Sequence, residues 1–160
     1  MCRVLIVEDD PQMRAFFAAS VRRSGQLELV CGVGSVSEAK ALLDDDLQRV
    51  DVLLTDLGLP DGSGLDVIRH ARLRHPGCEA LVISMFGDED NVLASIEAGA
   101  LGYIHKDAAP DDIATTILEM KAGASPISPM IARRVLSKYR SMQTNIALAP
   151  VSIECSAIKM

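Results

Sequence analysis

The chain has 160 residues, 49% of them hydrophobic and 24% charged, which is enough for one globular domain with a buried core. Its net charge of −6 repels polyphosphate and argues against non-specific nucleic-acid binding by this chain. No apolar run reaches the roughly 18 residues of a membrane span, and the first apolar stretch is too short for a signal peptide.

The cysteines indicate a reducing compartment. They are far apart and form no Cys-x-x-Cys pair, and the three histidines lack metal-ligand spacing to any of them. We therefore expect reduced, mostly buried thiols in a cytoplasmic protein. The four are Cys2, Cys31, Cys78 and Cys155.

The first quarter of the chain predicts two strands and two helices. The apolar run 3–7 is the first strand, and Asp10 with Pro11 then begins a helix, because aspartate caps helices and proline is favoured at the first helical position. Residues 27–33 form the second strand, and Ser35 with Glu38 is a capping box for the second helix. The first helix has an apolar stripe of Met13, Phe16, Phe17 and Val21 and ends near Gly25.

The middle of the chain repeats the alternation. The apolar run 52–54 is the third strand and ends abruptly on Thr55 and Asp56. A helix over 64–75 follows, with Leu65, Ile68 and Ala71 facing inward and Pro76 stopping it. Residues 79–84 form the fourth strand, and 88–98 form the fourth helix, which Gly99 closes.

The last pair is a short strand and a helix. The strand covers 102–105, and the helix starts at Pro110 and ends near Gly123. Its apolar positions are spaced i, i+4 and i+7 at Ile113, Ile117 and Met120.

Strands that are almost entirely apolar indicate a sheet covered on both faces, and their alternation with helices indicates parallel strands. The predicted fold is α/β: a flavodoxin-like, doubly wound, five-stranded parallel sheet of order 2-1-3-4-5 with helices on both faces. In such sheets the functional residues lie at the carboxyl ends of the strands, near the switch point between the first and third strands.

Charged and hydroxyl residues follow four of the predicted strands at this edge. Glu8 and Asp9 follow the first strand and Asp56 the third, so their carboxylates should lie within a few ångström of each other. Carboxylates that close repel strongly unless a cation neutralises them, and Mg²⁺ is the hard, oxygen-binding ion that suits them. Ser84 ends the fourth strand and Lys106 follows the fifth, where they can hold the oxygens of a phosphoryl group bound to Asp56.

Each of these signals also has a plain structural explanation. The acidic run after the first strand can be a solvated loop with a helix cap, and Asp56 can simply terminate its strand. Lys106 can be an ordinary surface lysine and Ser84 a turn hydroxyl. Four such positions at four strand ends are much less often accidental than any one alone.

The segments VLIVEDDPQMR, LLTDLGLPDGSGLDVI, LVIS and GALGYIHKD resemble the receiver (CheY-like) domain of two-component response regulators, from about residue 3 to residue 123. The resemblance implies that Asp56 is the phosphoacceptor for a sensor histidine kinase. It implies that Asp9 binds Mg²⁺ directly, that Glu8 acts through water, and that the carbonyl of Gly58 is a third protein ligand. Glu8 stands where aspartate is more usual in the family.

The same resemblance assigns a switch. Ser84 occupies the position of the switch hydroxyl, Tyr103 that of the switch aromatic, and Lys106 that of the phosphate-contacting lysine. When Asp56 is phosphorylated, Ser84 would move towards the phosphoryl group and Tyr103 would turn inward. Met85, beside Ser84, is larger than the residues common there and would crowd the entry to Asp56.

The segments HKDAAPDDI, with Asp107 after the lysine, and GASPISPMIARRVL resemble the LuxR-type (NarL/FixJ-type) subfamily, whose members add a DNA-binding helix-turn-helix. We expect a receiver domain over 1–123, a linker helix over 124–140 with Ile131, Val135 and Leu136 as its apolar positions, and a tail of unknown structure over 141–160, with the helix-turn-helix missing.

The leading interpretation is a phosphorylation-dependent regulator of transcription in the cytoplasm, not a metabolic enzyme. It would form a possible homodimer on phosphorylation, bind no membrane, and contact DNA only through the missing output domain. One alternative is a stand-alone receiver that acts by protein–protein interaction. Two rivals are weaker: an aspartyl phosphatase needs a second acid where this chain has Gly58, and a flavin-binding module needs a phosphate-cradling loop where this chain is acidic.

Overall fold

A computed structural model describes residues 1–84, 91–106 and 112–148. Its centre is a sheet of five parallel strands: Cys2–Val7 (β1), Leu27–Val33 (β2), Val52–Thr55 (β3), Glu79–Ser84 (β6) and Ala100–His105 (β7). Their spatial order is β2-β1-β3-β6-β7. The predicted order 2-1-3-4-5 is confirmed, because β6 and β7 are the fourth and fifth strands of this sheet.

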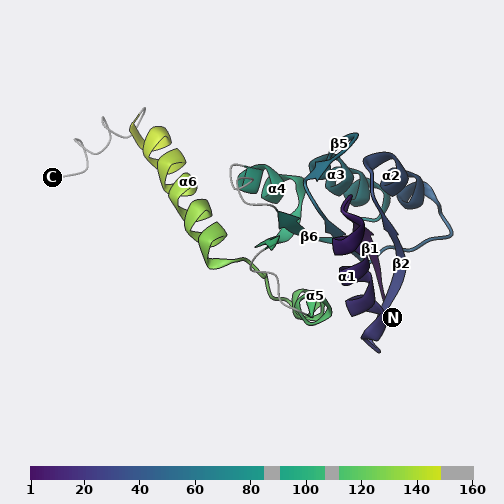
Figure 1. The fold of residues 1–160 in the computed structure, drawn as a ribbon. Helices are drawn as coiled ribbons and strands as arrows, with labels where there is room; N and C mark the ends of the chain where they lie inside the picture. The colour runs from purple at the N-terminus through teal and green to yellow at the C-terminus, as the bar shows by residue number, and fades with distance from the viewer. Residues whose placement is uncertain (85–90, 107–111, 149–160) are drawn as a thin grey trace.

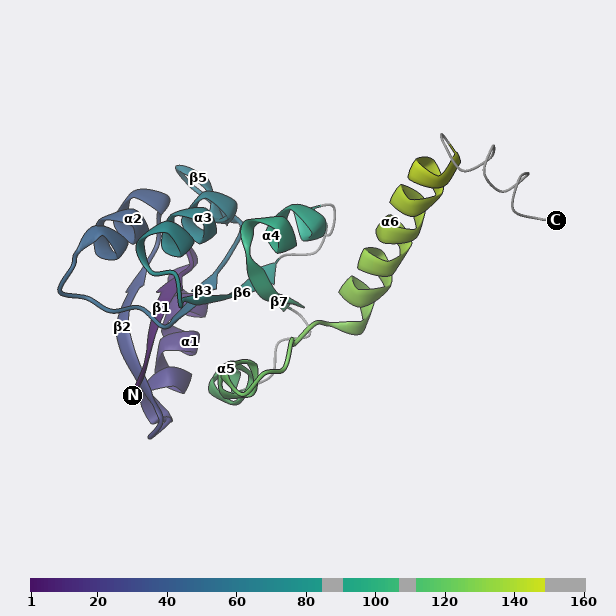
Figure 2. The same cartoon turned by 180° about the vertical axis from the view of Figure 1, so that it is seen from behind.

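Helices cover both faces of the sheet (Figures 1 and 2). One face carries Pro11–Arg23 (α1) and Ile113–Lys121 (α5). The other carries Val36–Asp44 (α2), Gly64–Arg74 (α3) and Val92–Ala98 (α4). The fold is therefore the doubly wound α/β fold that the sequence predicted.

Alternation along each strand divides the core into two layers. Leu5 and Val7 of β1 belong to the cluster beneath α2 and α3, whereas Val4 and Ile6 belong to the cluster beneath α1 and α5. Successive side chains of a strand point to opposite faces of the sheet, so a strand that is apolar at every position fills both layers. The sheet is thus buried on both faces, and its carboxyl edge is left for polar residues.

Side-chain caps fix where the helices start. Asp10 Oδ1 accepts a hydrogen bond of 2.9 Å from the N–H of Gln12 at the start of α1. Ser35 Oγ accepts one of 3.2 Å from the N–H of Glu38 at the start of α2. Both predicted caps are confirmed. Asp112 caps α5, and the predicted start at Pro110 lies outside the described residues.

Several predicted details differ from the structure. Phe16 belongs to the predicted apolar stripe of the first helix but is 44% exposed, while its neighbour Phe17 is buried. The fifth strand begins at Ala100, before the predicted position 102, because Ala100 already pairs with Ala80 of β6. The beginning of the predicted fourth helix lies outside the described residues.

A short hairpin, which the sequence did not predict, follows β3. Gly58–Leu59 (β4) pairs antiparallel with Gly62–Ser63 (β5). Gly62 has φ of +157°, near the extended limit, and Ser63 then caps α3. The hairpin leads the chain from the buried strand β3 directly into α3, over the end of the sheet.

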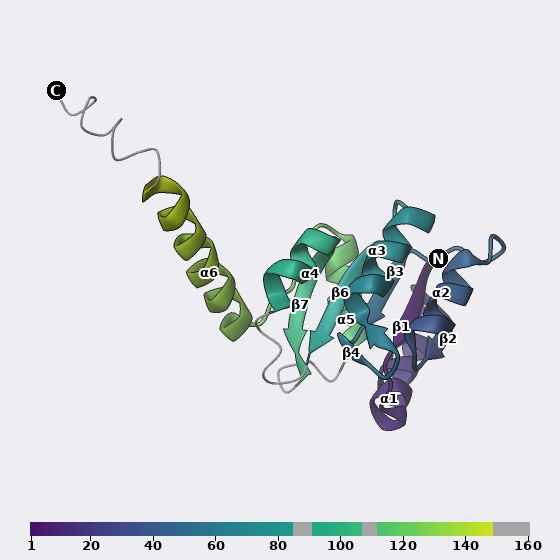
Figure 3. The ribbon, with the colours of Figure 1, turned by 90° about the horizontal axis from the view of Figure 1, so that it is seen from above.

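The last described helix, Pro129–Leu148 (α6), extends away from the sheet (Figures 1, 2 and 3). It starts later and runs further than the range 124–140 expected for a linker helix. Ile131 is fully buried and Val135 packs against the core, but Leu136 is 62% exposed, so its expected apolar role is wrong. No described helix has the length and apolarity needed to cross a membrane.

Candidate functional site

Three carboxylates meet at the carboxyl edge of the sheet. Glu8 and Asp9 follow β1, and Asp56 follows β3. The two strands are neighbours, with Val7 opposite Thr55. One carboxylate oxygen from each of the three residues lies within 4.8 Å of the others. The structure therefore brings these predicted site residues together, with Glu8 and Asp56 buried and Asp9 exposed.

Lys106 lies between two of these carboxylates. Its Nζ is 2.8 Å from Glu8 Oε1 and 3.1 Å from Asp56 Oδ2. Burial by itself lowers the pKa of an ammonium group, but the hydrogen bond to Glu8 and the charge of Asp56 outweigh this and raise the pKa of Lys106. The lysine therefore stays protonated and neutralises part of the buried negative charge.

Glu8 is 1% exposed, and this burial shifts the pKa of its carboxyl group. Loss of water raises the pKa of Glu8 to about 7, and the negative charge of Asp56 acts in the same direction. The ammonium of Lys106 opposes the rise, as does the N–H of Asp10, which donates a 3.1 Å hydrogen bond to Glu8 Oε2. A further cation in the cluster would favour the ionised form of Glu8.

Backbone contacts fix the Asp56 carboxylate in one orientation. The N–H of Leu57 donates a 2.7 Å hydrogen bond to Asp56 Oδ1, and Lys106 holds Oδ2. The start of α3 packs directly against the same residue: a Cβ on Gly64 would lie 2.1 Å from the backbone oxygen of Asp56. Only glycine fits there, so the glycine-rich loop after Asp56 allows helix α3 to approach the site.

The predicted ligand Gly58 lies in the hairpin two residues beyond Asp56 and is exposed. A Cβ built on it would meet no atom within 4 Å, so the space beside it is open. Its carbonyl as a metal ligand stays a prediction.

The two predicted switch residues are both buried. Ser84 ends β6 with 0% exposure, and its Oγ has no hydrogen-bond partner within the described ranges. Tyr103 on β7 is 1% exposed and belongs to the core cluster with α2, α3 and α4. The ring is therefore already inside in this structure. Met85 and Asp107 lie outside the described residues.

Arg14 is a residue of the site that the sequence did not predict. Its guanidinium Nη1 donates a 2.7 Å hydrogen bond to the backbone oxygen of Glu8. A Cβ on Gly34, the residue after β2, would lie 2.8 Å from this Nη1, so the glycine leaves room for the arginine to reach the end of β1. Its spacing could have indicated this role. Arg14 lies four residues after Asp10, one turn into the helix, and residues four apart share a face, so its side chain is on the side of the helix that starts beside Glu8.

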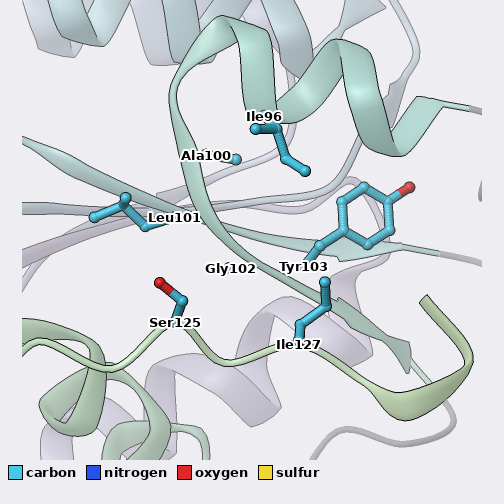
Figure 4. A pocket seen from close by; sticks show the side chains of 7 residues that line it. All are labelled: Ile96, Ala100, Leu101, Gly102, Tyr103, Ser125 and Ile127. Atoms are coloured by element: carbon cyan, nitrogen blue, oxygen red, sulfur yellow. The ribbon is translucent and has the colours of Figure 1, made fainter. Parts of the chain in front are cut away.

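Two hollows lie near these residues. One, of about 420 Å³, adjoins the acidic cluster and is lined by Asp10, Gln12, Met13, Phe16, Phe17 and Lys106. The exposed ring of Phe16 thus lines an approach to Lys106. The other is apolar, has a volume of about 290 Å³ and lies beside β7 (Figure 4). Its lining residues are Ile96, Ala100, Leu101, Gly102, Tyr103, Ser125 and Ile127.

The acidic cluster has the donor set that a hard divalent cation requires. Carboxylate oxygens are the protein ligands that Mg²⁺ prefers, and it keeps several waters besides. Glu8, Asp9 and Asp56 supply such oxygens within 4.8 Å of one another. Lys106 already neutralises one side of the cluster, and the exposed side of Asp9 leaves a way in for the ion.

Residues 4–118 match the family model described as the response regulator receiver domain. The chain is 30% identical over 140 residues to the DNA-binding transcriptional activator DevR/DosR of Mycobacterium tuberculosis, covering 88% of this chain and 64% of that protein. It is 28% identical to the transcriptional regulatory protein LiaR of Bacillus subtilis, covering 91% of this chain and 68% of that protein.

Solved structures agree with the sequence relatives. A LuxR-family two-component response regulator from Aurantimonas superposes with a TM-score of 0.73 at 27% identity, over 87% of this chain and 98% of that one. A CheY-like receiver domain protein from Methanospirillum hungatei superposes with a TM-score of 0.65 at 26% identity, over 75% of this chain and 93% of that one. The chain spans just under two thirds of the length of DevR/DosR, 64% of it.

Proposed function

Because this chain belongs to the response regulator receiver domain family, we propose that Asp56 accepts a phosphoryl group from a sensor histidine kinase in a Mg²⁺-dependent reaction. The observation that supports this most directly is the pairing of Asp56 Oδ2 with Lys106 Nζ at 3.1 Å inside the carboxylate cluster. Any buried carboxylate needs a cationic partner, but three carboxylates share this one lysine, and its ammonium lies where it can hold an oxygen of a phosphoryl group on Asp56.

In the transfer, an oxygen of Asp56 forms a bond to phosphorus while the bond from phosphorus to the donor nitrogen of a phosphohistidine breaks, and the electron pair leaves with the imidazole. The N–H of Leu57 holds one carboxylate oxygen, so the orientation of the group is set before the donor arrives. Lys106 then holds a phosphoryl oxygen, and its positive charge stabilises the charge on the transferring group.

Glu8, Asp9, Asp56 and the carbonyl of Gly58 would hold Mg²⁺. When bound, the ion neutralises the carboxylates and the developing charge on the phosphoryl oxygens. The chain's own share is to keep these oxygens together: Arg14 anchors the end of β1 through the Glu8 carbonyl, and Asp10 N–H fixes the Glu8 carboxylate.

The donor would approach across the exposed ring of Phe16. The hollow lined by Phe16, Met13 and Lys106 opens next to the cluster and offers an apolar contact beside a polar site. This supports the histidine kinase as partner, because a protein donor needs a surface on which to dock while the phosphoryl group moves.

The phosphoryl signal would leave the site through Ser84 and the face formed by α4, β7 and α5. The Ser84 hydroxyl is buried and has no hydrogen-bond partner within the described part of the chain, so a phosphoryl oxygen would give it one. A shift from about 1:99 to 99:1 takes about 5.5 kcal/mol, and one charge-assisted hydrogen bond supplies roughly 1.5–3 kcal/mol. Lys106 must therefore contribute, or the switch is partial. Buried Tyr103 would stabilise the inward state.

At the level of the cell, we propose a cytoplasmic regulator of transcription. The relative DevR/DosR is named as a DNA-binding transcriptional activator, and this chain covers 64% of it. Control of DNA would pass through a C-terminal DNA-binding region, with a homodimer forming on phosphorylation. The chain would regulate and not turn over a metabolite. A receiver that acts by protein–protein interaction is the alternative.

The test is the intact mass of the protein after incubation with acetyl phosphate and Mg²⁺. We expect the mass of one added phosphoryl group. This gain should be absent when Mg²⁺ is chelated before the incubation. It should also be absent in Asp56→Asn, which keeps the shape but removes the nucleophile. Asp61→Asn is the matched control, because Asp61 lies in the same loop but caps α2 through the N–H groups of Val36 and Ser37. Equal mass gain in Asp56→Asn and the parent would refute the assignment.

A further inference from the structure

The segment between α5 and α6 pairs with the edge of the sheet. Residues 125–128, which we call the strap, run parallel to β7, with Ile127 opposite Tyr103. The N–H of Tyr103 donates to the Pro126 carbonyl at 3.0 Å, and the N–H of Ser128 donates to the Tyr103 carbonyl at 3.2 Å. The strap therefore acts as one more short strand beside β7.

The strap needs a glycine on β7. A Cβ on Gly102 would lie 2.7 Å from the backbone oxygen of Pro126, closer than real contacts allow. Figure 4 shows the strap residues Ser125 and Ile127 beside Tyr103 and the bare backbone of Gly102. The contact is thus a close fit between two backbones.

Ser128 connects three parts of the molecule. Its hydroxyl accepts a 3.1 Å hydrogen bond from the N–H of His105, the last residue of β7. Its carbonyl accepts a 2.8 Å bond from the N–H of Ala132, in the first turn of α6. The side chain is 7% exposed, so water does not compete for the bond to His105. Because Lys106 directly follows His105, only one peptide unit separates this bond from the residue that holds Asp56.

We propose that Ser128 couples the Asp56 site to helix α6, so that the position of Lys106 is passed through His105 and Ser128 to the first turn of α6. This rests on the proposed function of Asp56. A phosphoryl group on Asp56 draws Lys106 from the carboxylate to a phosphoryl oxygen, and the end of β7 follows. Ser128 moves with His105, and α6 begins at the next residue, Pro129. Buried Ile131 anchors the same turn, so α6 shifts as a unit.

The experiment is amide hydrogen exchange with and without beryllofluoride and Mg²⁺, a pair of reagents that stands in for the phosphoryl group. In the parent protein, we expect the amides of His105 and Ala132 to change their exchange rates together. In Ser128→Ala, the exchange of the first turn of α6 should already be faster by roughly two- to ten-fold, the factor for one neutral hydrogen bond. It should no longer respond to beryllofluoride, while fluorine NMR still detects the bound reagent.

Two controls separate the bond from general damage to the strap. Ser125→Ala alters the same strap at an exposed position and should respond like the parent protein. Ser128→Thr keeps the hydroxyl and should restore the α6 response. A response of α6 in Ser128→Ala equal to that of the parent would overturn the coupling.

The outcomes also separate this inference from the proposed function. Phosphorylation of Asp56 with α6 unchanged in the parent protein overturns the coupling alone. Absence of any mass gain and of any bound beryllofluoride overturns the proposed function, and the coupling with it. If Ser128→Ala fails to fold, the parent protein decides, because a change at His105 without one at Ala132 also refutes the coupling.

Discussion

At the scale of single residues, the site is a balance of buried charges. Glu8 and Asp56 are nearly inaccessible, and the ammonium of Lys106 is within hydrogen-bond distance of both. Lys106 and a divalent cation would therefore both neutralise the carboxylates of the cluster, from different sides. The sequence predicted the carboxylates and the lysine at this edge, but it could not show that Lys106 pairs with Glu8, because side-chain reach depends on how far β7 extends relative to β1.

Removal of Lys106 should destabilise the folded protein and make its stability depend more strongly on Mg²⁺. Lys106→Ala leaves two buried carboxylates without their cation, and loss of one partner of a buried pair costs several kcal/mol. Because the Lys106 side chain is 13% exposed, we expect a loss of about 2–4 kcal/mol in the free energy of unfolding without metal. Mg²⁺ should restore much of that loss, measured by urea denaturation with and without the ion.

The control is Lys121→Ala, which breaks a partly exposed ion pair of 3.3 Å with Glu79 at the other end of β6. That change should cost less than about 1 kcal/mol and show no response to Mg²⁺. If Mg²⁺ stabilises the parent protein and Lys106→Ala equally, the lysine and the ion do not share the charge of the cluster.

At the scale of elements, sequence patterns predicted the strands and most helix starts, because burial on both faces and side-chain caps are local signals. They failed where an apolar residue meets no neighbouring element. Phe16 has the spacing of the buried stripe of α1 but lines an open hollow, and Leu136 lies on the part of α6 beyond the sheet. The hairpin β4–β5 was missed because two-residue strands have no periodicity to detect.

Ile131 should be the main anchor of helix α6. Ile131 is fully buried in the core cluster beneath α4, whereas Leu136, one and a half turns later, is 62% exposed. Ile131→Ala should therefore lower the free energy of unfolding by roughly 2–5 kcal/mol, the usual cost of such a cavity. Leu136→Ala should change it by less than about 0.5 kcal/mol. Thermal or urea denaturation of both variants gives the comparison, and equal losses would mean that α6 is held elsewhere.

At the scale of the whole molecule, charge is divided between the receiver fold and α6. The chain carries −6 in total, yet α6 contains Arg133, Arg134, Lys138 and Arg140 and no acidic residue. The doubly wound fold and the acidic edge followed from the sequence because they depend on alternation and strand order. The direction of α6 did not, because it is set by the tertiary contacts of Ser128 and Ile131.

This division leads to a prediction about DNA. Helix α6 carries four basic residues, but no helix follows it in the described part of the chain to complete a helix-turn-helix. Any binding by this 160-residue chain should therefore be equal for promoter and scrambled DNA. It should weaken with salt with a log–log slope no steeper than about −4, which corresponds to four phosphate contacts. Fluorescence anisotropy titrations at several salt concentrations measure both quantities. Replacement of Arg133 and Arg134 by alanine should reduce the slope by about 2. A clear preference for promoter DNA at physiological salt would overturn this prediction.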